Sequence, residues 1–277
     1  MRRILLLVVL SVAGCAGRFD STTLVERLRV LGVRAEPPSV GLNDDVELSA
    51  LVVDPAGAGR TLSATWKVCL VDPREPDTAC EASNSLPIEG NQLSVTLTMT
   101  ELVAWLADMG INPGDFPLQE LTVLIALKVS GGLESVKASK RLILLLNEEA
   151  PGNQNPFLDG FLLNGEDPGT EPIVLPTGSV YTLKPVMGPG SREWFLPPDE
   201  QEQKQEEHLF NWYSTGGSFS DGRTILDTDN AGNNLDINEW TLPEEPGIYT
   251  LWLVLRDGRY GIDWLAADFE VVAQDGS

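Results

Sequence analysis

The stretch Leu62-Ser-Ala-Thr-Trp-Lys-Val-Cys-Leu70 alternates apolar and polar side chains, with Ala64, Trp66 and Val68 on the apolar parity. Successive side chains of a β-strand point to opposite faces of its sheet, so this pattern predicts a half-buried strand. Trp66 lies in the middle of the apolar parity and is expected in a hydrophobic core. The stretch therefore favours a β fold.

The same alternation recurs along the chain and predicts an all-β protein. Turn-forming pairs such as Asp54-Pro55 and Gly131-Gly132 separate the alternating segments. Short strands with turns at this spacing indicate a β-sandwich. Asp257-Gly258 predicts a tight hairpin turn between the last two strands. The predicted strands are 28–33, 45–53, 62–70, 92–98, 121–129 and 135–146, followed by 155–163, 180–186, 208–215, 249–256 and 264–272.

The predicted strands fall into two groups separated by a polar segment. Residues 147–155 are rich in Asn and Glu and show no apolar period, which is typical of a linker. Trp212 occupies in the second group the position that Trp66 holds in the first. We therefore predict two sandwich domains, 24–147 and 155–273, joined by a linker at 148–154. A chain of 277 residues is long enough for both.

One segment of the first domain has a helical period instead. Thr98 and Glu101 have the spacing of a capping box, and Gly110 is placed to end the helix. We predict a short helix across one end of the first sandwich. A membrane-binding amphipathic helix is the alternative, but its polar face lacks the Lys and Arg that such helices favour. The apolar positions at helical spacing are Leu102, Val103, Leu106 and Met109.

The N-terminus has the pattern of an export signal. Arg2 and Arg3 precede an apolar run at 4–12, which is too short for the roughly 20 residues that span a membrane. Val12-Ala-Gly-Cys15 follows, and the whole resembles the bacterial lipoprotein signal with its lipobox. The resemblance implies a signal peptide at 1–14, acylation of Cys15 and a lipidated tether at 15–23. The alternative is an ordinary secretory signal.

That resemblance also predicts where the protein resides. In this class of lipoprotein an aspartate after the acylated cysteine favours the inner membrane, and here Ala16 occupies the position. We therefore expect an outer-membrane lipoprotein, periplasmic or surface-exposed, held by its lipid group.

The composition is strongly acidic, with 41 Asp and Glu against 19 Lys and Arg and a net charge of −22. Such a surface is poorly suited to nucleic-acid phosphates, which need clustered Lys and Arg. Export makes a disulfide between the two other cysteines, Cys69 and Cys80, the expected pairing. Two free buried thiols are the alternative.

The second half resembles bacterial immunoglobulin-like domains of the PKD and cadherin-like kind. The matching stretches begin at Asn211-Trp-Tyr213 and continue to Arg256-Asp-Gly258. The stretch Leu28–Pro38, following the lipobox, is similar to the start of uncharacterised lipoproteins of myxobacteria. Cys69 lies three residues after Trp66, so a bridge to Cys80 would be a local staple and not the inter-sheet bridge of antibody domains. The further matching stretches are Gly217-Ser-Phe219, Trp240-Thr-Leu-Pro243 and Pro246-Gly-Ile-Tyr-Thr250.

No catalytic pattern emerges from the sequence. His208 is the one histidine, so a Ser-His-Asp hydrolase would have to use it, and we interpret it as a surface residue beside the solvated charge run 200–207. No Cys/His group has zinc-ligand spacing. A glycosidase carboxylate pair stays open as a remote alternative. We therefore predict a non-enzymatic protein that requires no cofactor.

The loop 221–239 is rich in oxygen ligands of the kind that Ca²⁺ binds. Ala231 and Asn238 depart from the EF-hand pattern, so only weak calcium binding is expected. The alternative is a plain loop, because Asp, Asn and Gly also form turns. The candidate ligands are Asp227, Asp229, Asn233 and Asp236.

The function predicted from these features is that of a lipid-anchored structural or interaction module of the cell envelope. A glycan- or peptide-binding module, supported by calcium, is the alternative. In that case Trp194, Trp240 or Tyr260 would stack on the ligand. The partner is then an envelope protein or a glycan whose identity the sequence does not supply.

Overall fold

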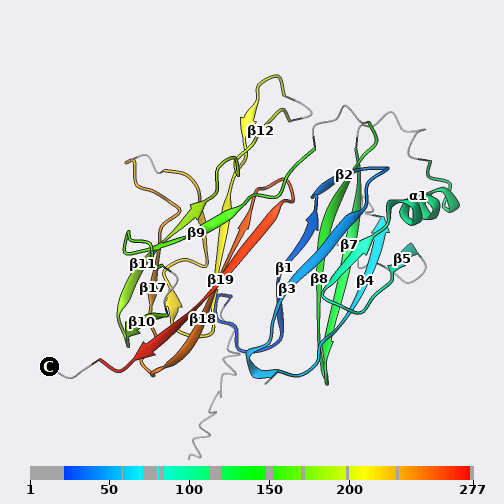
Figure 1. The fold of residues 1–277 in the computed structure, drawn as a ribbon. Coiled ribbons are helices and arrows are strands. Elements are labelled where there is room, and N and C mark those ends of the chain that lie inside the picture. Colours follow the sequence, from blue (N-terminus) through cyan, green and yellow to red (C-terminus); the bar gives the residue numbers. More distant parts are fainter. Residues whose placement is uncertain are drawn as a thin grey trace, which may run out of the picture.

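The protein forms two β-sandwiches that lie side by side (Figure 1). The computed structural model describes residues 22–57, 59–70, 80, 84–112, 120–147, 152–169, 172–197, 200–228 and 231–274. Strands dominate this part of the chain and one α-helix is present in it, so the all-β prediction with a short helix in the first domain is confirmed. No helix within the described ranges combines the length and apolar character needed to cross a membrane.

The first sandwich has a three-stranded and a five-stranded sheet, in the orders β1-β3-β6 and β2-β8-β7-β4-β5. The chain leaves the first sheet after β1, passes a cis Glu36–Pro37 peptide and joins the second sheet as β2, parallel to β8. This strand order is that of an immunoglobulin-like sandwich. The strands are β1 (Arg29–Glu36), β2 (Ser39–Gly41), β3 (Val46–Val53), β4 (Ser63–Leu70), β5 (Ser85–Ile88), β6 (Ser94–Leu97), β7 (Glu120–Gly131) and β8 (Glu134–Leu145), with a 3₁₀ turn at Pro55–Gly57.

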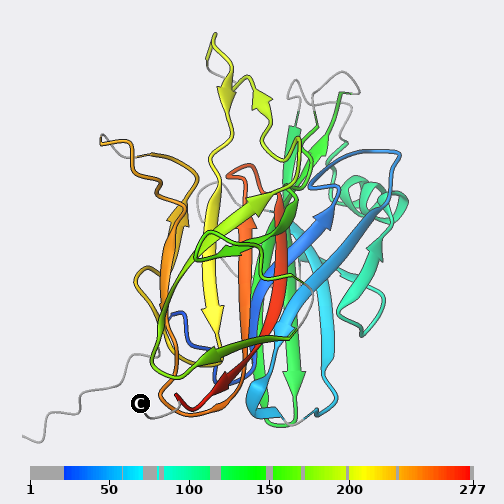
Figure 2. The same cartoon turned by 60° about the vertical axis from the view of Figure 1, so that its left-hand side comes forward.

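The second sandwich repeats this plan, with sheets β15-β17-β11-β9 and β10-β19-β18-β14-β16. Here β10 runs parallel to β19, as β2 does to β8. A small hairpin, β12–β13, is inserted between β11 and β14 and projects beyond the sandwich (Figure 2). The elements are β9 (Leu158–Leu163), β10 (Ile173–Pro176), β11 (Val180–Met187), β12 (Trp194–Phe195), β13 (Lys204–Gln205), β14 (Leu209–Ser214), β15 (Ser218–Phe219), β16 (Arg223–Ile225), β17 (Asn238–Thr241), β18 (Gly247–Arg256) and β19 (Ile262–Val272).

Each sandwich is built around a buried tryptophan on the equivalent strand. Trp66 on β4 and Trp212 on β14 are both fully buried, as their parity predicted. The Trp66 indole N–H donates to the Gln92 carbonyl at 2.9 Å, and that of Trp212 donates to the Thr224 hydroxyl at 2.9 Å. Each ring is buried and its one polar atom is hydrogen-bonded, so both tryptophans stabilise the cores around them.

The helix α1 (Met99–Asp108) is present with Thr98 at its N-cap position, but the predicted capping box does not form. The Thr98 side chain makes no cap hydrogen bond, and instead the Asp45 carboxylate accepts the Met99 N–H at 3.0 Å. The predicted end is confirmed: Gly110 has φ +77°, and its N–H bonds to the Ala107 carbonyl at 2.9 Å. A left-handed residue after the last turn is the usual glycine helix ending.

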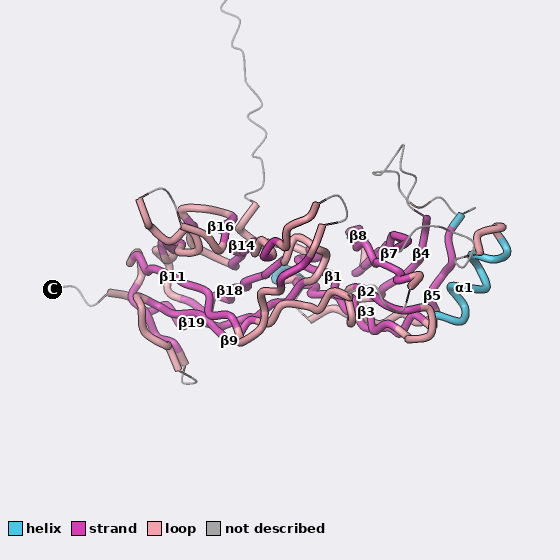
Figure 3. Tube along the Cα trace, turned by 90° about the horizontal axis from the view of Figure 1, so that it is seen from above, coloured by secondary structure: helices cyan, strands magenta, loops and turns pink. Residues whose placement is uncertain are grey.

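The two sandwiches share a buried apolar cluster. It lies where β1 of the first sandwich runs beside β19 of the second (Figures 1 and 3). A Cβ on Gly32 would lie 2.9 Å from Ile262, so glycine permits this close approach. Arg34 forms an ion pair with Asp263 at 2.9 Å and covers the Trp264 ring at 4.8 Å. The two domains therefore pack as one body in this structure. The buried members of the cluster are Val25, Leu31, Val53, Trp252, Val254 and Ile262.

Residues at both borders of the predicted domains also contact the neighbouring sandwich. The Val25 N–H donates to the Ser214 carbonyl of β14 at 2.8 Å, so the segment before β1 lies against the second sandwich. Asn153, from the predicted linker, is buried and donates to the Asp257 carboxylate at 2.8 Å. Asn155 donates to the Ala35 carbonyl at 2.7 Å. The predicted linker therefore bonds to both sandwiches, because the Asn153 backbone N–H also donates to the Ser39 hydroxyl of the first one.

Candidate ligand-binding cleft

A cleft of about 840 Å³ lies between the two sandwiches, and we call it the interdomain cleft. Its floor is the outer face of β4, β7 and β8, and the loop between β18 and β19 closes one side. No acidic side chain lines it among the described residues, although the chain has more than twice as many acids as bases. The basic residues that line it are Lys67, Lys128, Lys137, Lys140, Arg141 and Arg256.

The strand register gathers four of these charges on one sheet face. Inward residues such as Trp66 alternate with outward residues along each strand, so the outward positions of β4, β7 and β8 form rows across the sheet. The three adjacent rows at the cleft contain four cations and no acid, whereas Glu120 lies on the same face at the start of β7, outside the cleft lining. The rows are Thr65–Lys128–Lys137, Lys67–Ala126–Ser139 and Cys69–Leu124–Arg141.

Lys128 and Lys137 lie directly opposite each other on β7 and β8. Like charges at paired positions of neighbouring strands repel and reduce sheet stability. No ion pair to either lysine is present within the described chain. An anion bound between the two ammonium groups would relieve this repulsion.

Lys140 is a different kind of cation because its side chain is buried, with 8% exposed. Its ammonium has no hydrogen bond or ion pair among the described residues. Burial lowers the pKa of Lys140 from 10.5 to about 8; Asp257 opposes this shift and Arg256 adds to it. The Asp257 carboxylate accepts the backbone N–H groups of Arg259 and Gly261, each at 2.7 Å, and forms no ion pair with Lys140 within the described residues.

The predicted hairpin at Asp257-Gly258 is present, since β18 and β19 pair antiparallel, and its loop spans residues 257–261, which is longer than a two-residue turn. The buried Asp257 carboxylate bonds three donors in or near the loop and thereby fixes the longer form. Tyr260 has φ +78°, a conformation that bulky residues rarely adopt. Its hydroxyl accepts a hydrogen bond from Arg141 at 3.1 Å, which holds the ring at the cleft wall.

The structure separates the three aromatic residues proposed to stack on a ligand. Trp240 is fully buried and packs edge-on against Phe269 at 4.9 Å, so the ligand-stacking interpretation of Trp240 is wrong. Trp194 is 62% exposed on the projecting hairpin, away from the cleft lining. Tyr260, 36% exposed, is the one of the three that lines the cleft.

His208 is buried, so its interpretation as a surface residue is wrong. Its Nε2 lies 3.7 Å from the Glu206 carboxylate, and neither ring nitrogen has a hydrogen bond in the described structure. Burial would raise the pKa of Glu206, but His208, the Glu193 N–H and Arg259 together outweigh it and lower that pKa. No hydroxyl group is bonded to the imidazole, so these residues do not form a Ser-His-acid triad.

The charge run 200–207 was expected to be a solvated loop; Lys204 and Glu207 are exposed, but the run also contains a strand and one buried carboxylate. Lys204–Gln205 form β13, and Glu206 is 1% exposed. Glu206 accepts a hydrogen bond from Arg259 at 3.0 Å, and the Arg259 guanidinium covers the Phe195 ring at 4.7 Å. The hairpin β12–β13 is thus attached to the loop that closes the cleft.

The candidate calcium ligands do not gather in the described residues. Asp227 and Asn233 are exposed, whereas Asp236 is 4% exposed and lines a different groove together with Lys184. Burial raises the pKa of Asp236 despite the opposing charge of Lys184. The described part contains no group of three His, Cys, Asp or Glu residues suited to a metal ion. Asp229 lies outside the described residues, and weak calcium binding stays a prediction.

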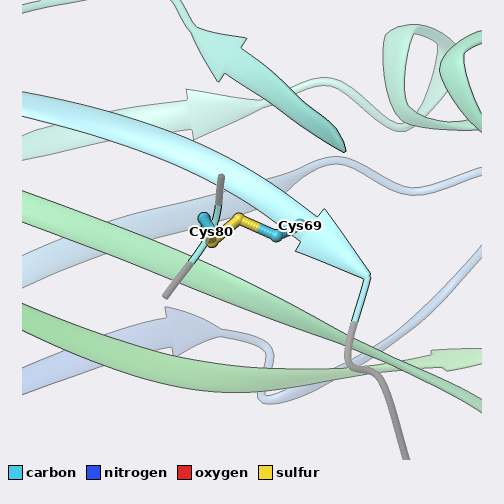
Figure 4. Close-up of a disulfide and its surroundings, with 2 residues drawn as sticks. All are labelled: Cys69 and Cys80. Carbon is cyan, nitrogen blue, oxygen red and sulfur yellow. A yellow bond between two sulfur atoms is a disulfide. The ribbon is translucent and has the colours of Figure 1, made fainter. Parts of the chain in front are cut away.

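Cys69 and Cys80 form the expected disulfide, with their Cα atoms 5.6 Å apart (Figure 4). Cys69 is near the end of β4 and Cys80 lines the interdomain cleft. The bridge joins residues 11 positions apart and not the two sheets, as its position after Trp66 implied. Cys15, the expected lipidation site, lies outside the described residues.

The comparisons with known proteins do not assign this chain to a family. No protein-family model matches the chain, and no curated protein matches it either. Among solved structures, the chain is similar to the two tandem V-type regions of VCBP3, a v-region-containing chitin-binding protein. The identity is 11%, the match covers 88% of this chain and 99% of that one, and the TM-score is 0.31. The assignment as a tandem immunoglobulin-like protein rests on the strand orders given above.

The cationic cleft was not predicted from the sequence, although part of its signal is visible there. Lys128, Lys137 and Arg141 occupy the outward parity of two predicted strands in an otherwise acidic chain. The contributions of Arg256 and Tyr260 have no local signal, because the packing of the second sandwich brings them to this face.

Proposed function

We propose that this protein is a lipid-anchored, non-enzymatic interaction module of the cell envelope, and that its interdomain cleft binds an anionic partner. The observation that carries the proposal is the lining of the cleft: six cations and no acid among the described residues of a chain with net charge −22. A positive cleft within a negative surface concentrates the electrostatic field and selects anions at that one place.

The arrangement of the described chain is compatible with anchoring at Cys15. The first described residues, from Thr22, lie toward the end of the molecule opposite the β12–β13 hairpin (Figures 1 and 2). A lipid on Cys15 would therefore hold that end near the membrane and leave the hairpin end pointing away. The cleft lining is rigid sheet on one side and a fixed loop on the other, which suits binding better than a loose surface does.

The absence of an assembled catalytic group in the described residues supports a binding role. His208 is buried and no hydroxyl or thiol of the described residues bonds to its ring nitrogens. No pair of carboxylates lies among the described residues that line the cleft. Recognition by side-chain charge is therefore the chemistry that the cleft offers.

Retention of anionic envelope material on the immobilised protein tests the proposal. The test variant carries Lys128→Glu and Lys137→Glu, which reverse two exposed charges on the cleft floor. Lys204→Glu, which reverses one charge on the distant hairpin, is the control outside the cleft. We expect the wild type and the control to retain an anionic fraction that 1 M salt releases, since salt screens exposed charges (Debye length about 3 Å). Equal retention by the double variant would contradict the proposal.

A further inference from the structure

We propose that the anionic partner is an acidic oligosaccharide, with one anionic sugar substituent against Lys140 and Arg256 and a sugar ring against Tyr260. This inference rests on the proposed function and names its ligand class. It concerns the shared chemistry of carboxylated, sulfated and phosphorylated sugars.

Lys140 and Arg256 both contribute to the cleft lining and form the candidate anion subsite, and the nearby Asp257 carboxylate contributes an opposing charge. Lys140 is buried, lines the cleft and has no ion-pair partner in the described chain. Arg256 precedes Asp257 in the chain. One of its guanidinium N–H groups donates to the Leu31 carbonyl at 3.1 Å, which fixes the position of the side chain. Burial lowers the pKa of Arg256 as well, so both cations are incompletely solvated. A partly desolvated cation binds an anion more strongly than an exposed one does.

The spread of the remaining charges requires a ligand with several anionic groups. Lys137 and Arg141 are four residues apart on β8, which is about 13 Å at the rise of a strand. Lys128 and Lys67 lie on the neighbouring strands, about 5 Å apart for each strand step. A single small anion cannot contact all of them, whereas a short oligomer with a charge on each unit can.

The floor of the cleft favours a saccharide over a peptide. A peptide that binds as an added strand needs free backbone groups at a sheet edge. Here the floor is a sheet face, and β7 is paired with β4 on one side and β8 on the other. Recognition must therefore come from side chains. The Thr65 and Ser139 hydroxyls and the Tyr260 ring, beside the cations, match the hydroxyl groups, apolar ring faces and charges of an acidic sugar.

The decisive experiment is isothermal titration calorimetry on the full exported chain with four probes. Hexagalacturonic acid is the acidic oligosaccharide, maltohexaose is its neutral counterpart, hexaglutamate is the acidic peptide, and sodium sulfate is the small anion. We expect hexagalacturonic acid to bind at least tenfold more tightly than hexaglutamate, with no detectable heat from maltohexaose and weaker binding of sulfate.

Three variants locate the site. Lys140→Met should weaken hexagalacturonic acid binding about 10- to 100-fold, the range for loss of a hydrogen bond to a charged group. Tyr260→Asn removes the ring but tolerates the positive φ of this position, and should weaken binding about tenfold. Lys204→Met is the control with the same charge change outside the cleft, and its affinity should stay within about twofold of wild type. Circular dichroism verifies that all three are folded.

The outcomes separate this inference from the proposed function. Equal affinity for hexaglutamate and hexagalacturonic acid would overturn the saccharide assignment and leave an anion-binding cleft in place. Tight binding that survives both Lys140→Met and Tyr260→Asn would place the saccharide elsewhere and overturn the inference. No binding of any anionic probe or envelope fraction would overturn both proposals.

Discussion

Replacing Lys140 by methionine should stabilise the protein at neutral pH. The Lys140 ammonium is buried without a partner in the described chain, and its pKa is lowered from 10.5 to about 8. That difference corresponds to about 3 kcal/mol by which the charged form destabilises the folded state. Methionine keeps an unbranched chain of similar length and removes the charge, so most of this free energy should be recovered.

The sign of the pH dependence follows from the direction of the pKa shift. Because the folded pKa lies below the unfolded one, the unfolded chain binds more protons between about pH 8 and 10.5. The wild type therefore gains stability from Lys140 deprotonation as pH rises through this window, and the full penalty is present below it. The stability advantage of Lys140→Met should be about 3 kcal/mol at pH 7 and shrink toward zero near pH 10.5.

Urea unfolding of both proteins at a series of pH values from 7 to 10 measures this difference. The buffer must contain chloride as its only anion, since a bound polyanion would stabilise the wild type by linkage. Equal m-values for the two proteins would show that the variant unfolds from the same structure. A Lys140→Met protein less stable than wild type at pH 7 would refute the reasoning, because it would mean that the ammonium has a stabilising partner.

Four further predictions follow from other sites. Glu206→Gln leaves Arg259 without its buried partner and should reduce the free energy of unfolding by about 3 kcal/mol at neutral pH. Because the pKa of Glu206 is lowered in the folded protein, this contribution should disappear as pH falls below 4.5. A difference between the urea melts of the two proteins that does not change with pH would be inconsistent with this prediction. Replacing Cys69 and Cys80 by alanine should lower stability by about 2–3 kcal/mol, measured the same way, and no change would mean that the bridge constrains nothing in the unfolded chain. Cys15→Ser should abolish metabolic palmitate labelling and release the protein from membranes, and persistent labelling would exclude the lipobox assignment. Calcium at millimolar concentration should raise the stability of the protein by about 1 kcal/mol at most by binding to the Asp- and Asn-rich loop 221–239. If calorimetry detects no heat of calcium binding, the Asp and Asn residues of this loop serve only to form turns.

The cores could be predicted because strand parity is a local property. Alternation identified Trp66 as a buried residue from its immediate neighbours, and Trp212 was recognised by its equivalent position. The helix α1 was likewise visible from spacing alone, although its cap comes from Asp45, more than fifty residues away. Local pattern thus predicts which face of an element is apolar, and it does not predict which distant side chain completes its ends.

The packing of the two sandwiches depends on shape at long range and was not predicted. Trp252 and Val254 lie on the outward parity of β18, where they are buried only because the first sandwich covers them. Glu206 also depends on a partner far away in the chain, since Arg259 of the loop between β18 and β19 bonds its carboxylate. The cleft is the product of this packing, because Lys140 and Arg256 come from different sandwiches.

Lysine footprinting tests most directly whether the interdomain cleft is the binding site. The protein is labelled with an amine-reactive reagent, with and without saturating hexagalacturonic acid, and each lysine is quantified by peptide mass spectrometry. We expect strong protection of Lys128 and Lys137 on the cleft floor and unchanged labelling of Lys204 on the hairpin. Equal labelling of Lys128 and Lys137 in both samples, under conditions in which calorimetry shows the ligand bound, would contradict this expectation.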